Sequence, residues 1–421
     1  MSEFDKVIGY KDIKLELKRF CDVIKNPEKY EKVGVKAPAG ILLHGDPGLG
    51  KTLMAQCFIR ESGRKAFILR KDKPDGDFVN HIREVFEKAK SEAPCIVFLD
   101  DMDKFANEGP VHKDADEYVT VQTQIDECKG LGVFVLATVN DRWSLPDSLV
   151  RSGRFDKVIG IKYPRGEDAV KIIAHFLEGK KVVGDVNAEE IGRLIEGHSC
   201  AELESVINEA GIYAGYEGRD KVGKEDLVKA SMRLLFNAPE CMKKRDPEYL
   251  THIAVHEAGH AVLGEVLNPG CINLVSIYKS HGSTEGLTKY CREDEPDFTK
   301  EQMERRVICA LGGKAATEIV YGIADTGCNS DLEKAFSLVE KFVDHFCAYG
   351  FAAFEDHKSS DYLLEMKDRM VAMEMERYYQ LAKKLLIDNR AFFDAMKTEL
   401  VQKYILTCKD IAAIREDCGK E

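Results

Sequence analysis

Several features are missing from this sequence, and each absence excludes a class of protein. The 421 residues carry a formal net charge of −12, which argues against a general nucleic-acid binder, because such proteins normally have a basic excess. No apolar run approaches the roughly 18 residues that span a bilayer, and the first residues, M-S-E-F-D-K, do not resemble a signal peptide. We therefore expect a cytoplasmic protein without a membrane span, or alternatively the soluble part of a longer, membrane-anchored protein.

Paired cysteine motifs are also missing. The 13 cysteines are an odd number and form no C-x-x-C pair, so we interpret them as reduced thiols that mostly fill the core. Charged residues make up 32% and hydrophobic residues 44% of the chain, which is typical of a soluble globular protein. A chain of this length can form two or three domains, each with a core of its own.

The chain alternates short apolar runs with amphipathic segments up to about residue 164. Three runs are typical of fully buried strands: A-G-I-L-L-H-G (39–45), C-I-V-F-L-D (95–100) and G-V-F-V-L-A-T-V (132–139). Between the first two, H-I-R-E-V-F-E-K-A-K (81–90) is typical of a helix. Continuous apolar strands separated by helices predict an α/β fold, in which a parallel sheet is covered by flanking helices.

The remainder of the chain is mostly helical by the same criteria. A helical region from about 165 to 236 is followed by a polar, proline-bearing stretch, N-A-P-E-C-M-K-K-R-D-P (237–247), which we interpret as a linker. From residue 248 the chain is again mainly helical. Four residues repeat there with 3-4-3 spacing on one helix face, and we interpret them as core: Leu363, Met366, Met370 and Met373.

The octapeptide G-D-P-G-L-G-K-T matches the phosphate-loop pattern G-x-x-x-x-G-K-[ST], and it stands between a predicted strand and a predicted helix. Its glycines let main-chain N–H groups surround phosphates, and the helix N-terminus adds the positive end of its dipole. We expect Lys51 to neutralise the β- and γ-phosphates of ATP and Thr52 to hold Mg²⁺. Asp46 of this loop is unusual, because a carboxylate beside a triphosphate is repelled unless it points away. The predicted nucleotide site comprises Gly45, Asp46, Pro47, Gly48, Leu49, Gly50, Lys51 and Thr52.

Polar side chains follow the next two predicted strands. Asp100 ends the second of the three apolar strands, where it is placed to hold Mg²⁺, and Asp101 beside it is placed to polarise the attacking water. Asn140 follows the third strand, and we expect it to hydrogen-bond the same water. Arg151 and Arg154 come soon after; arginine can stabilise the charge on a transferring phosphoryl group, although two arginines alone are more typical of a surface.

The stretch A-V-H-E-A-G-H contains His256, Glu257 and His260 in the order H-E-x-x-H. Residues four apart share one helix face, so the two histidines can bind a single metal ion from adjacent turns. Glu257 lies at the edge of that face, where it can act as a general base toward a metal-bound water. The alternative is a helix with two core histidines, but a chance match to the whole pattern is uncommon.

A third metal ligand is not evident from spacing. His252 lies on the same face, but it stands ~12 Å from His260 along a straight helix, too far for one zinc ion with bonds of ~2.1 Å. Spacing alone does not choose among the acids downstream: Glu285, Glu318, Asp325 and Asp331. Ser330 and Glu333 match a capping box, which predicts that Asp331 lies in the first turn of a helix.

The N-terminal motifs together resemble the AAA+ ATPase module. They are F-D-K-V-I-G-Y-K-D-I-K, the phosphate loop, C-I-V-F-L-D-D-M-D and S-G-R-F-D. The resemblance implies that the two arginines act across a hexameric ring and that a helical lid follows the sheet. It also places His175 near the adenine, with Ile8 and Gly9 opposite. In this family the second acid is usually Glu, so the shorter Asp101 predicts slower hydrolysis.

The C-terminal motifs resemble the peptidase domain of the membrane-associated AAA proteases known as FtsH. They are H-E-A-G-H-A-V, L-G-G-K-A-A-T-E (311–318) and T-G-C-N-S-D-L-E-K-A (326–335). The resemblance implies that Asp331 is the third zinc ligand and that residues 282–290 include an edge strand to which substrate adds. We therefore predict three domains: an AAA+ nucleotide-binding domain (1–164), an AAA+ helical lid (165–238) and a mainly helical zinc-metallopeptidase domain (239–421).

The resemblance implies an ATP-dependent zinc metalloprotease with Zn²⁺, ATP and Mg²⁺ as cofactors. We expect a homo-oligomer, a hexamer, that acts on unfolded or loosely folded polypeptides and binds no nucleic acid. The chain lacks the usual membrane anchor, and its loop R-K-D-K-P-D-G-D-F (70–78) is charged and lacks the family's substrate-gripping aromatic-glycine motif. Two alternatives remain: a zinc peptidase with a weak or structural ATPase ring, and an AAA+ remodeller with an idle peptidase.

Overall fold

The computed structural model describes most of the chain, and contacts divide it into two compact units. The first unit comprises Met1–Val183 and Gly197–Val222, and the second comprises Gly184–Glu196 and Gly223–Glu421. The predicted domain boundaries, after residues 164 and 238, remain a prediction. The described residues are 2–35, 38–71, 75–106, 115–151, 153–184, 186–239, 245–278, 285–291, 299–323, 326–350 and 360–419.

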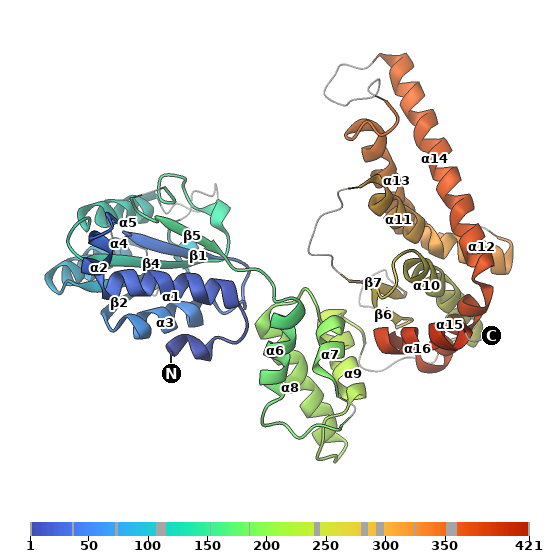
Figure 1. The fold of residues 1–421 in the computed structure, drawn as a ribbon, viewed down its shortest axis with the longest axis horizontal. Helices are drawn as coiled ribbons and strands as arrows, with labels where there is room; N and C mark the ends of the chain where they lie inside the picture. The colour runs from blue at the N-terminus through green and yellow to red at the C-terminus, as the bar shows by residue number, and fades with distance from the viewer. Residues whose placement is uncertain are drawn as a thin grey trace. The chain divides into compact units, whose positions relative to one another are not determined.

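The first unit contains a parallel sheet with helices packed around it (Figure 1). Its five strands have the order β2-β3-β4-β1-β5. Its strands are β1 (Gly40–His44), β2 (Lys65–Leu69), β3 (Cys95–Leu99), β4 (Val133–Val139) and β5 (Lys157–Gly160). Three of them confirm the predicted buried strands, and in the register Leu42 of β1 lies opposite Ala137 of β4. The carboxyl ends of β1, β3 and β4 therefore meet at one edge of the sheet.

Helices cover both faces of this sheet. Val135 of β4 belongs to one buried cluster with Phe86 and Ile125, whereas the neighbouring Phe134 stacks on Phe58 at a ring distance of 5.6 Å. Burial on both faces explains why these strands read as continuous apolar runs. The helices of this unit are η1 (Glu3–Lys6), α1 (Lys11–Lys25), α2 (Pro27–Glu31), α3 (Lys51–Ser62), α4 (Asp75–Ser91), η2 (Met102–Lys104), α5 (Ala115–Glu127), η3 (Arg142–Ser144), α6 (Gly166–Leu177) and α8 (Cys200–Tyr216).

The second unit is mainly helical. Its antiparallel sheet has the order β7-β6-β8, which leaves β7 at an edge. Its elements are α7 (Ala188–Leu194), α9 (Lys224–Leu235), α10 (Pro247–Leu267), β6 (Ile272–Ser276), β7 (Leu287–Tyr290), α11 (Lys300–Ala310), α12 (Gly312–Tyr321), η4 (Thr326–Cys328), α13 (Asn329–Asp344), α14 (Asp361–Asp388), α15 (Arg390–Lys403), β8 (Ile405–Thr407) and α16 (Cys408–Cys418).

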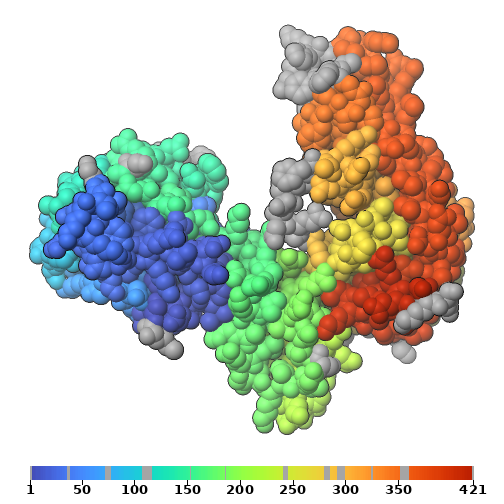
Figure 2. All heavy atoms as spheres, viewed as in Figure 1, coloured from blue at the N-terminus to red at the C-terminus, as the bar shows by residue number. Residues whose placement is uncertain are grey.

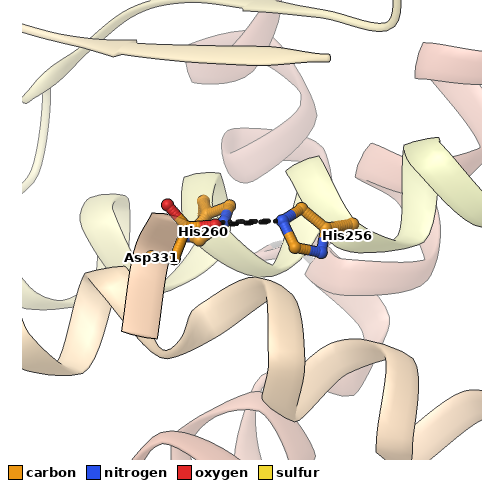
Figure 3. Close-up of side chains that lie close together, drawn as sticks. All are labelled: His256, His260 and Asp331. Atoms are coloured by element: carbon orange, nitrogen blue, oxygen red, sulfur yellow. Dashed lines mark hydrogen bonds and ion pairs between the residues drawn. The ribbon is translucent and has the colours of Figure 1, made fainter. Parts of the chain in front are cut away.

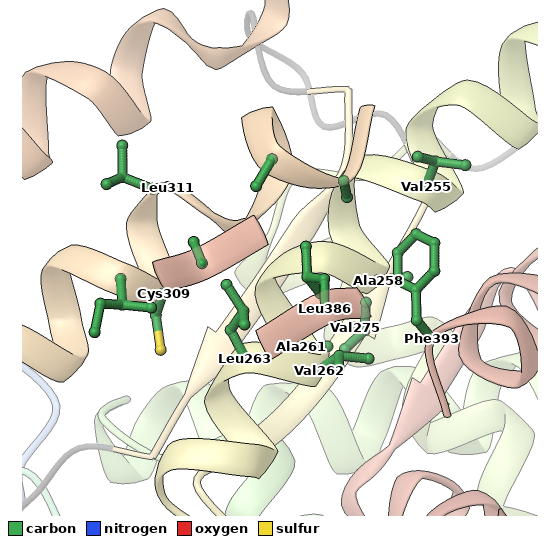
Figure 4. Packing of buried hydrophobic residues seen from close by; sticks show 14 of the residues in the cluster. Val255, Ala258, Ala261, Val262, Leu263, Val275, Cys309, Leu311, Leu386 and Phe393 are labelled. Atoms are coloured by element: carbon green, nitrogen blue, oxygen red, sulfur yellow. The ribbon is translucent and has the colours of Figure 1, made fainter. Parts of the chain in front are cut away.

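Helix α10 lies at the centre of this second core. Its residues Val255, Ala258 and Val262 pack in one buried cluster with Val275 of β6 and Phe393 of α15 (Figure 4). The C-terminal residues, red in Figure 2, lie directly against the yellow segment that contains α10, and Arg415 donates to the Glu265 carbonyl oxygen at 2.7 Å. The histidine-bearing helix is therefore held from several sides.

Two local predictions need correction. Helix α13 begins at Asn329, with Cys328 as its N-cap and no side-chain cap, so the capping box from Ser330 is wrong, although Asp331 does lie in the first turn. The interpretation of Met373 as core is also wrong, because its side chain is 73% exposed. The buried face of α14 is instead formed by Lys367, Val371, Met375, Tyr378, Ala382 and Leu386.

Parts of three predicted segments lie outside the described residues. They are 72–74 of the charged loop, 240–244 of the linker and 282–284 of the predicted edge strand. The rest of that last segment confirms an edge strand, β7. In the part of the chain that the structure describes, no helix is long and apolar enough to cross a membrane.

Candidate metal centre and nucleotide site

The two histidines and the aspartate predicted to bind zinc lie together in the second unit (Figure 3). His256 and His260 project from adjacent turns of α10, and Asp331 approaches them from the first turn of α13. The two Nε2 atoms are 3.1 Å apart, and Asp331 Oδ2 lies 3.3 Å from each of them. Three ligand atoms from two helices that lie far apart in the sequence thus meet at one point.

These three atoms fit a zinc ion. A tetrahedral ion with bonds of about 2.0–2.1 Å separates its ligand atoms by about 3.3–3.4 Å, close to the observed spacings. His260 Nδ1–H donates to the Cys309 carbonyl oxygen at 2.8 Å, which leaves its Nε2 lone pair for a metal. Three protein ligands leave a fourth position open, as in catalytic zinc sites.

The other ligand candidates make different contacts. The His252 ring stacks on Tyr321 at 4.8 Å and does not belong to the metal cluster found among the described residues. Glu285 pairs with Arg245 at 2.9 Å. Glu318 accepts hydrogen bonds from Tyr379 and from Lys383, the latter at 2.5 Å. Asp325 lies outside the described residues.

Glu257 lies beside the metal cluster and is only 7% exposed. It lines, with the cluster, a cavity of about 1730 Å³ in the second unit. Thr288 Oγ1 donates to Glu257 Oε2 at 2.6 Å, and the Tyr290 hydroxyl donates to the His260 carbonyl oxygen at 3.2 Å. Thr288 and Tyr290 are not among the site residues predicted from the sequence. Their alternation in L-T-K-Y is compatible with a strand, but nothing local shows which helix the strand faces.

The phosphate loop of the first unit connects β1 to α3. Gly50 is the N-cap of α3, has a positive φ of 84° and provides no side-chain cap, so the first N–H groups of the helix suit a phosphate. Lys51 Nζ crosses the loop and donates to Gly45 O at 2.7 Å and Asp46 O at 2.8 Å. The Asp46 side chain is exposed. Together the loop residues fit the β- and γ-phosphates of a nucleotide.

Thr52 and Asp100 lie next to each other, as a shared Mg²⁺ would require. Thr52 Oγ1 donates to Asp100 Oδ1 at 3.1 Å, and Thr138 Oγ1 donates to the same oxygen at 2.7 Å. Arg70, which follows the end of β2, is not among the predicted site residues and forms an ion pair with the buried Asp100. Burial would raise the pKa of Asp100, but these three partners lower it. The carboxylate is therefore ionised, and Arg70 stands where it would compete with a cation.

Asn140 and Asp101, two further catalytic candidates, follow the ends of β4 and β3. Asn140 Oδ1 accepts from Lys51 Nζ at 2.9 Å, and the Asn140 main-chain N–H donates to Asp103 Oδ2 at 3.0 Å. Asp101 adopts a left-handed backbone conformation with φ 52° and pairs with Lys104 at 2.6 Å. The three strand ends thus bring the predicted residues together at one edge of the sheet.

The two predicted arginines differ in their surroundings. Arg151 is exposed. Arg154 is only 2% exposed; it donates to both Asp126 carboxylate oxygens, at 3.0 and 2.5 Å, and to the Ser148 carbonyl oxygen. Hydrogen bonds from Arg154 are the main cause that lowers the pKa of Asp126 to about 2. These contacts anchor Arg154 within the first unit, and its action on a neighbouring subunit stays a prediction.

Of the residues predicted near the adenine, Gly9 and His175 both lie at helix α6, but at different places along it. Gly9 packs against α6, where a Cβ on it would lie 3.2 Å from Asp168 Cβ. His175 lies two turns further along α6, with Nδ1 3.3 Å from Glu178 Oε2, and Ile8 is half-buried. The roles of Ile8, Gly9 and His175 remain predictions.

A parallel sheet with a phosphate loop, joined to a helical unit with an H-E-x-x-H metal cluster, defines a P-loop ATPase fused to a metallopeptidase. Two family models match accordingly: the ATPase family associated with various cellular activities (AAA) over residues 41–163, and peptidase family M41 over residues 244–414.

Curated relatives match almost the whole chain. ATP-dependent zinc metalloprotease FtsH 2 of Thermoanaerobacter sp. is 30% identical over 433 residues, which cover 98% of this chain and 83% of the relative. FtsH 1 of Thermomicrobium roseum is 29% identical over 446 residues, covering 98% and 68%, and FtsH of Helicobacter pylori is 29% identical over 446 residues, covering 98% and 70%. The chain belongs to the FtsH family of ATP-dependent zinc metalloproteases, which confirms the predicted fold class and the Zn²⁺ and ATP cofactors.

Proposed function

We propose that this chain forms a hexameric ring that hydrolyses ATP to deliver unfolded or loosely folded polypeptides to its zinc sites, where peptide bonds are hydrolysed. The observation that carries the proposal is the metal cluster, in which three ligand atoms stand at zinc spacing with Glu257 one residue from His256. The phosphate loop and its acids in the same chain support a coupled ATPase. The cytoplasmic location remains a prediction.

In this proposal Glu257 is the general base. Zn²⁺, when bound to His256, His260 and Asp331, supplies a Lewis acid for the carbonyl and lowers the pKa of water. The Glu257 carboxylate takes the proton from the attacking water and passes it to the leaving amine nitrogen. The burial of Glu257 keeps its oxygens from being screened by solvent.

The ATPase residues have matching proposed roles. Mg²⁺, when bound by Thr52 and Asp100, offsets the charge of the β- and γ-phosphates. Lys51 binds these phosphates, and Asn140, hydrogen-bonded to Lys51, orients the water that Asp101 polarises. Arg151, the exposed arginine of the pair, acts on the nucleotide of a neighbouring subunit.

Substitution of Glu257 tests this function. We expect Glu257→Gln to abolish cleavage of an unstructured protein, because the amide does not accept the proton, while zinc binding and ATP hydrolysis are retained. The measurement is product release together with phosphate release and zinc content. Lys51→Ala is the matched variant that should lose ATP hydrolysis and keep zinc. Loss of both activities in Glu257→Gln, or of neither, would contradict the proposal.

A second candidate is a zinc peptidase with a slow ATPase ring that binds nucleotide mainly to hold the oligomer. The ion pair between Arg70 and Asp100 favours it, as does the short side chain of Asp101. We expect Arg70→Ala to lower the Mg²⁺ concentration needed for half-maximal ATP hydrolysis, because no guanidinium then competes for Asp100. The remaining alternative is an AAA+ remodeller whose peptidase is inactive, and it requires that no polypeptide is cleaved.

A further inference from the structure

The side chains on the two faces of strand β7 form hydrogen bonds with different helices. Because side chains alternate along a strand, Thr288 and Tyr290 point to one side and Lys289 to the other. On the first side, Thr288 donates to Glu257 and Tyr290 donates to the His260 carbonyl oxygen. Both bonds end on α10, at the residues that carry the proposed chemistry.

The Glu257 carboxylate is fixed by this strand. The Thr288 hydroxyl bonds Oε2 at 2.6 Å, a short, charge-assisted hydrogen bond. A Cβ placed on Gly286 would lie 2.5 Å from Glu257 Oε1 and 2.7 Å from Cγ, so the carboxylate rests directly against the backbone there. A glutamate side chain loses rotamer freedom when it is ordered, so a single orientation needs such contacts. The hydroxyl and the missing side chain at Gly286 together hold one orientation.

The other face of β7 is bonded to helix α7. Lys289 Nζ donates to the Leu194 carbonyl oxygen at 3.1 Å and to that of Glu196 at 2.9 Å, where an ammonium group also complements the negative end of the helix dipole. On the adjacent strand, Asn273 Nδ2 donates to Glu196 Oε2 at 3.0 Å. The end of α7 is therefore attached to the β6–β7 pair by three hydrogen bonds within one compact unit.

From Glu196 the chain continues into α8, whose first turn contacts the phosphate loop. Ala201 follows Glu196 by five residues, which span at most about 18 Å, and its main-chain N–H donates to Gly48 O at 3.1 Å in the first unit. A Cβ on Gly48 would also lie 2.9 Å from Ser199 Oγ. The segment that follows Glu196 therefore leads within five residues to a main-chain contact with the phosphate loop.

We propose that Thr288 is a positioning residue for Glu257, and that β7, anchored by Lys289 to the end of α7, couples the orientation of this base to the nucleotide-binding loop. The proposal rests on the proposed function, because it assumes that Glu257 acts as the base. Thr288 does not touch the scissile bond; it acts through Glu257. Lys289 adjoins Thr288 along the strand, so a movement of its anchor moves the hydroxyl as well.

The first test removes the hydroxyl in the zinc-loaded full chain. The substrate is a short fluorogenic peptide, which needs no transport. We expect Thr288→Val to lower kcat by about 10–100-fold, since small misplacements of a catalytic group cost this much, with KM within about twofold and zinc content unchanged. Thr288→Ser keeps the hydroxyl and should stay within about threefold of the unsubstituted chain. Thr398→Val is the control, because Thr398 is exposed and its hydroxyl donates to the Asp394 carbonyl oxygen of the same helix.

Three results would overturn the positioning role: an unchanged kcat in Thr288→Val, an equal loss in Thr288→Ser, or a loss explained by missing zinc. If Thr288→Val does not fold, Gly286→Ala provides the same test, because its methyl group displaces the carboxylate and should lower kcat with zinc retained. Failure of the proposed function looks different, since the unsubstituted chain would then not cleave the peptide, or Glu257→Gln would cleave it normally.

The second test addresses the coupling. We expect kcat for the short peptide to change when a non-hydrolysable ATP analogue is bound, and this response to disappear in Lys289→Met while ATP hydrolysis persists. Lys384→Met, at an exposed position of α14, should respond like the unsubstituted chain. An unsubstituted chain without the response, or a Lys289→Met variant that keeps it, would contradict the coupling.

Discussion

The histidines near the metal cluster differ in their contacts, and these contacts distinguish metal ligands from a packing residue. His256, His260 and Asp331 present ligand atoms to one point, whereas His252 stacks on Tyr321. The sequence predicts the histidine pair from four-residue spacing alone. It does not predict Asp331 in this way, because the approach of α13 to α10 is a tertiary contact. For that residue only the family resemblance was informative.

Substitution of the third ligand should weaken zinc binding selectively. We expect Asp331→Asn to lower zinc affinity at least about tenfold, since even outer partners of metal ligands are worth roughly 10–100-fold. His252→Ala is the control and should keep its affinity. Competition with a chromophoric chelator measures both. Equal affinities in Asp331→Asn and the unsubstituted chain would remove Asp331 from the ligand set.

The two arginines provide a second contrast at this scale. Arg154→Ala leaves Asp126 without its main partner, and we expect a loss of about 1–3 kcal/mol of unfolding free energy. Arg151→Ala should change stability by less than about 0.5 kcal/mol but lower ATP hydrolysis by roughly 10³-fold or more. Denaturation and phosphate release distinguish them. Normal hydrolysis in Arg151→Ala would show that this arginine does not act on a nucleotide.

The Asp126 pair also predicts a pH dependence. Its folded pKa of about 2 lies below the ordinary 3.8, so its contribution to stability is present above about pH 4 and is lost as the pH falls through about 2. We expect the stability difference between the unsubstituted chain and Asp126→Asn to shrink over this range. A difference that is constant from pH 6 to pH 2 would contradict the pairing.

At the scale of elements, buried strands were predictable and helix details were not. The strands β1, β3 and β4 are apolar on both faces, which leaves a continuous signal in the sequence. The start of α13 was misplaced because Ser330 matches a capping box, while the helix begins at Asn329, whose side chain bonds Glu333 at 2.9 Å. On α14, the spacing predicts a buried face that includes Met373. Tertiary packing instead buries the face that includes Val371 and Met375.

Close packing of α10 on α12 leads to a prediction at this scale. A Cβ on Gly259 would strike the Gly312 carbonyl oxygen and lie 2.6 Å from Ala316 Cβ. We expect Gly259→Ala to destabilise the second unit by about 1–3 kcal/mol and to weaken zinc binding. Gly211→Ala in α8 is the matched control: a Cβ there meets nothing within 4 Å, so it should stabilise by about 0.5–1 kcal/mol. Similar unfolding curves for both variants would contradict the close approach.

At the scale of the whole molecule, two sites with different chemistry occupy one chain of the FtsH family. The nucleotide site lies at the carboxyl edge of a parallel sheet, and the metal centre lies on a helix of the second unit. The charged loop at 70–78 departs from the family pattern, and Arg70 at its start contacts Asp100. Whether cleavage requires ATP hydrolysis therefore decides between the proposed protease and a peptidase with a structural ring.

Degradation of an unstructured protein under three conditions tests this central claim most directly. The account predicts rapid cleavage with ATP and Mg²⁺, strong inhibition when a non-hydrolysable analogue replaces ATP, and complete loss with a zinc chelator that is reversed by added Zn²⁺. Cleavage that is sensitive to the chelator but indifferent to ATP hydrolysis would contradict ATP-driven delivery. Absence of cleavage under all conditions would contradict the protease itself.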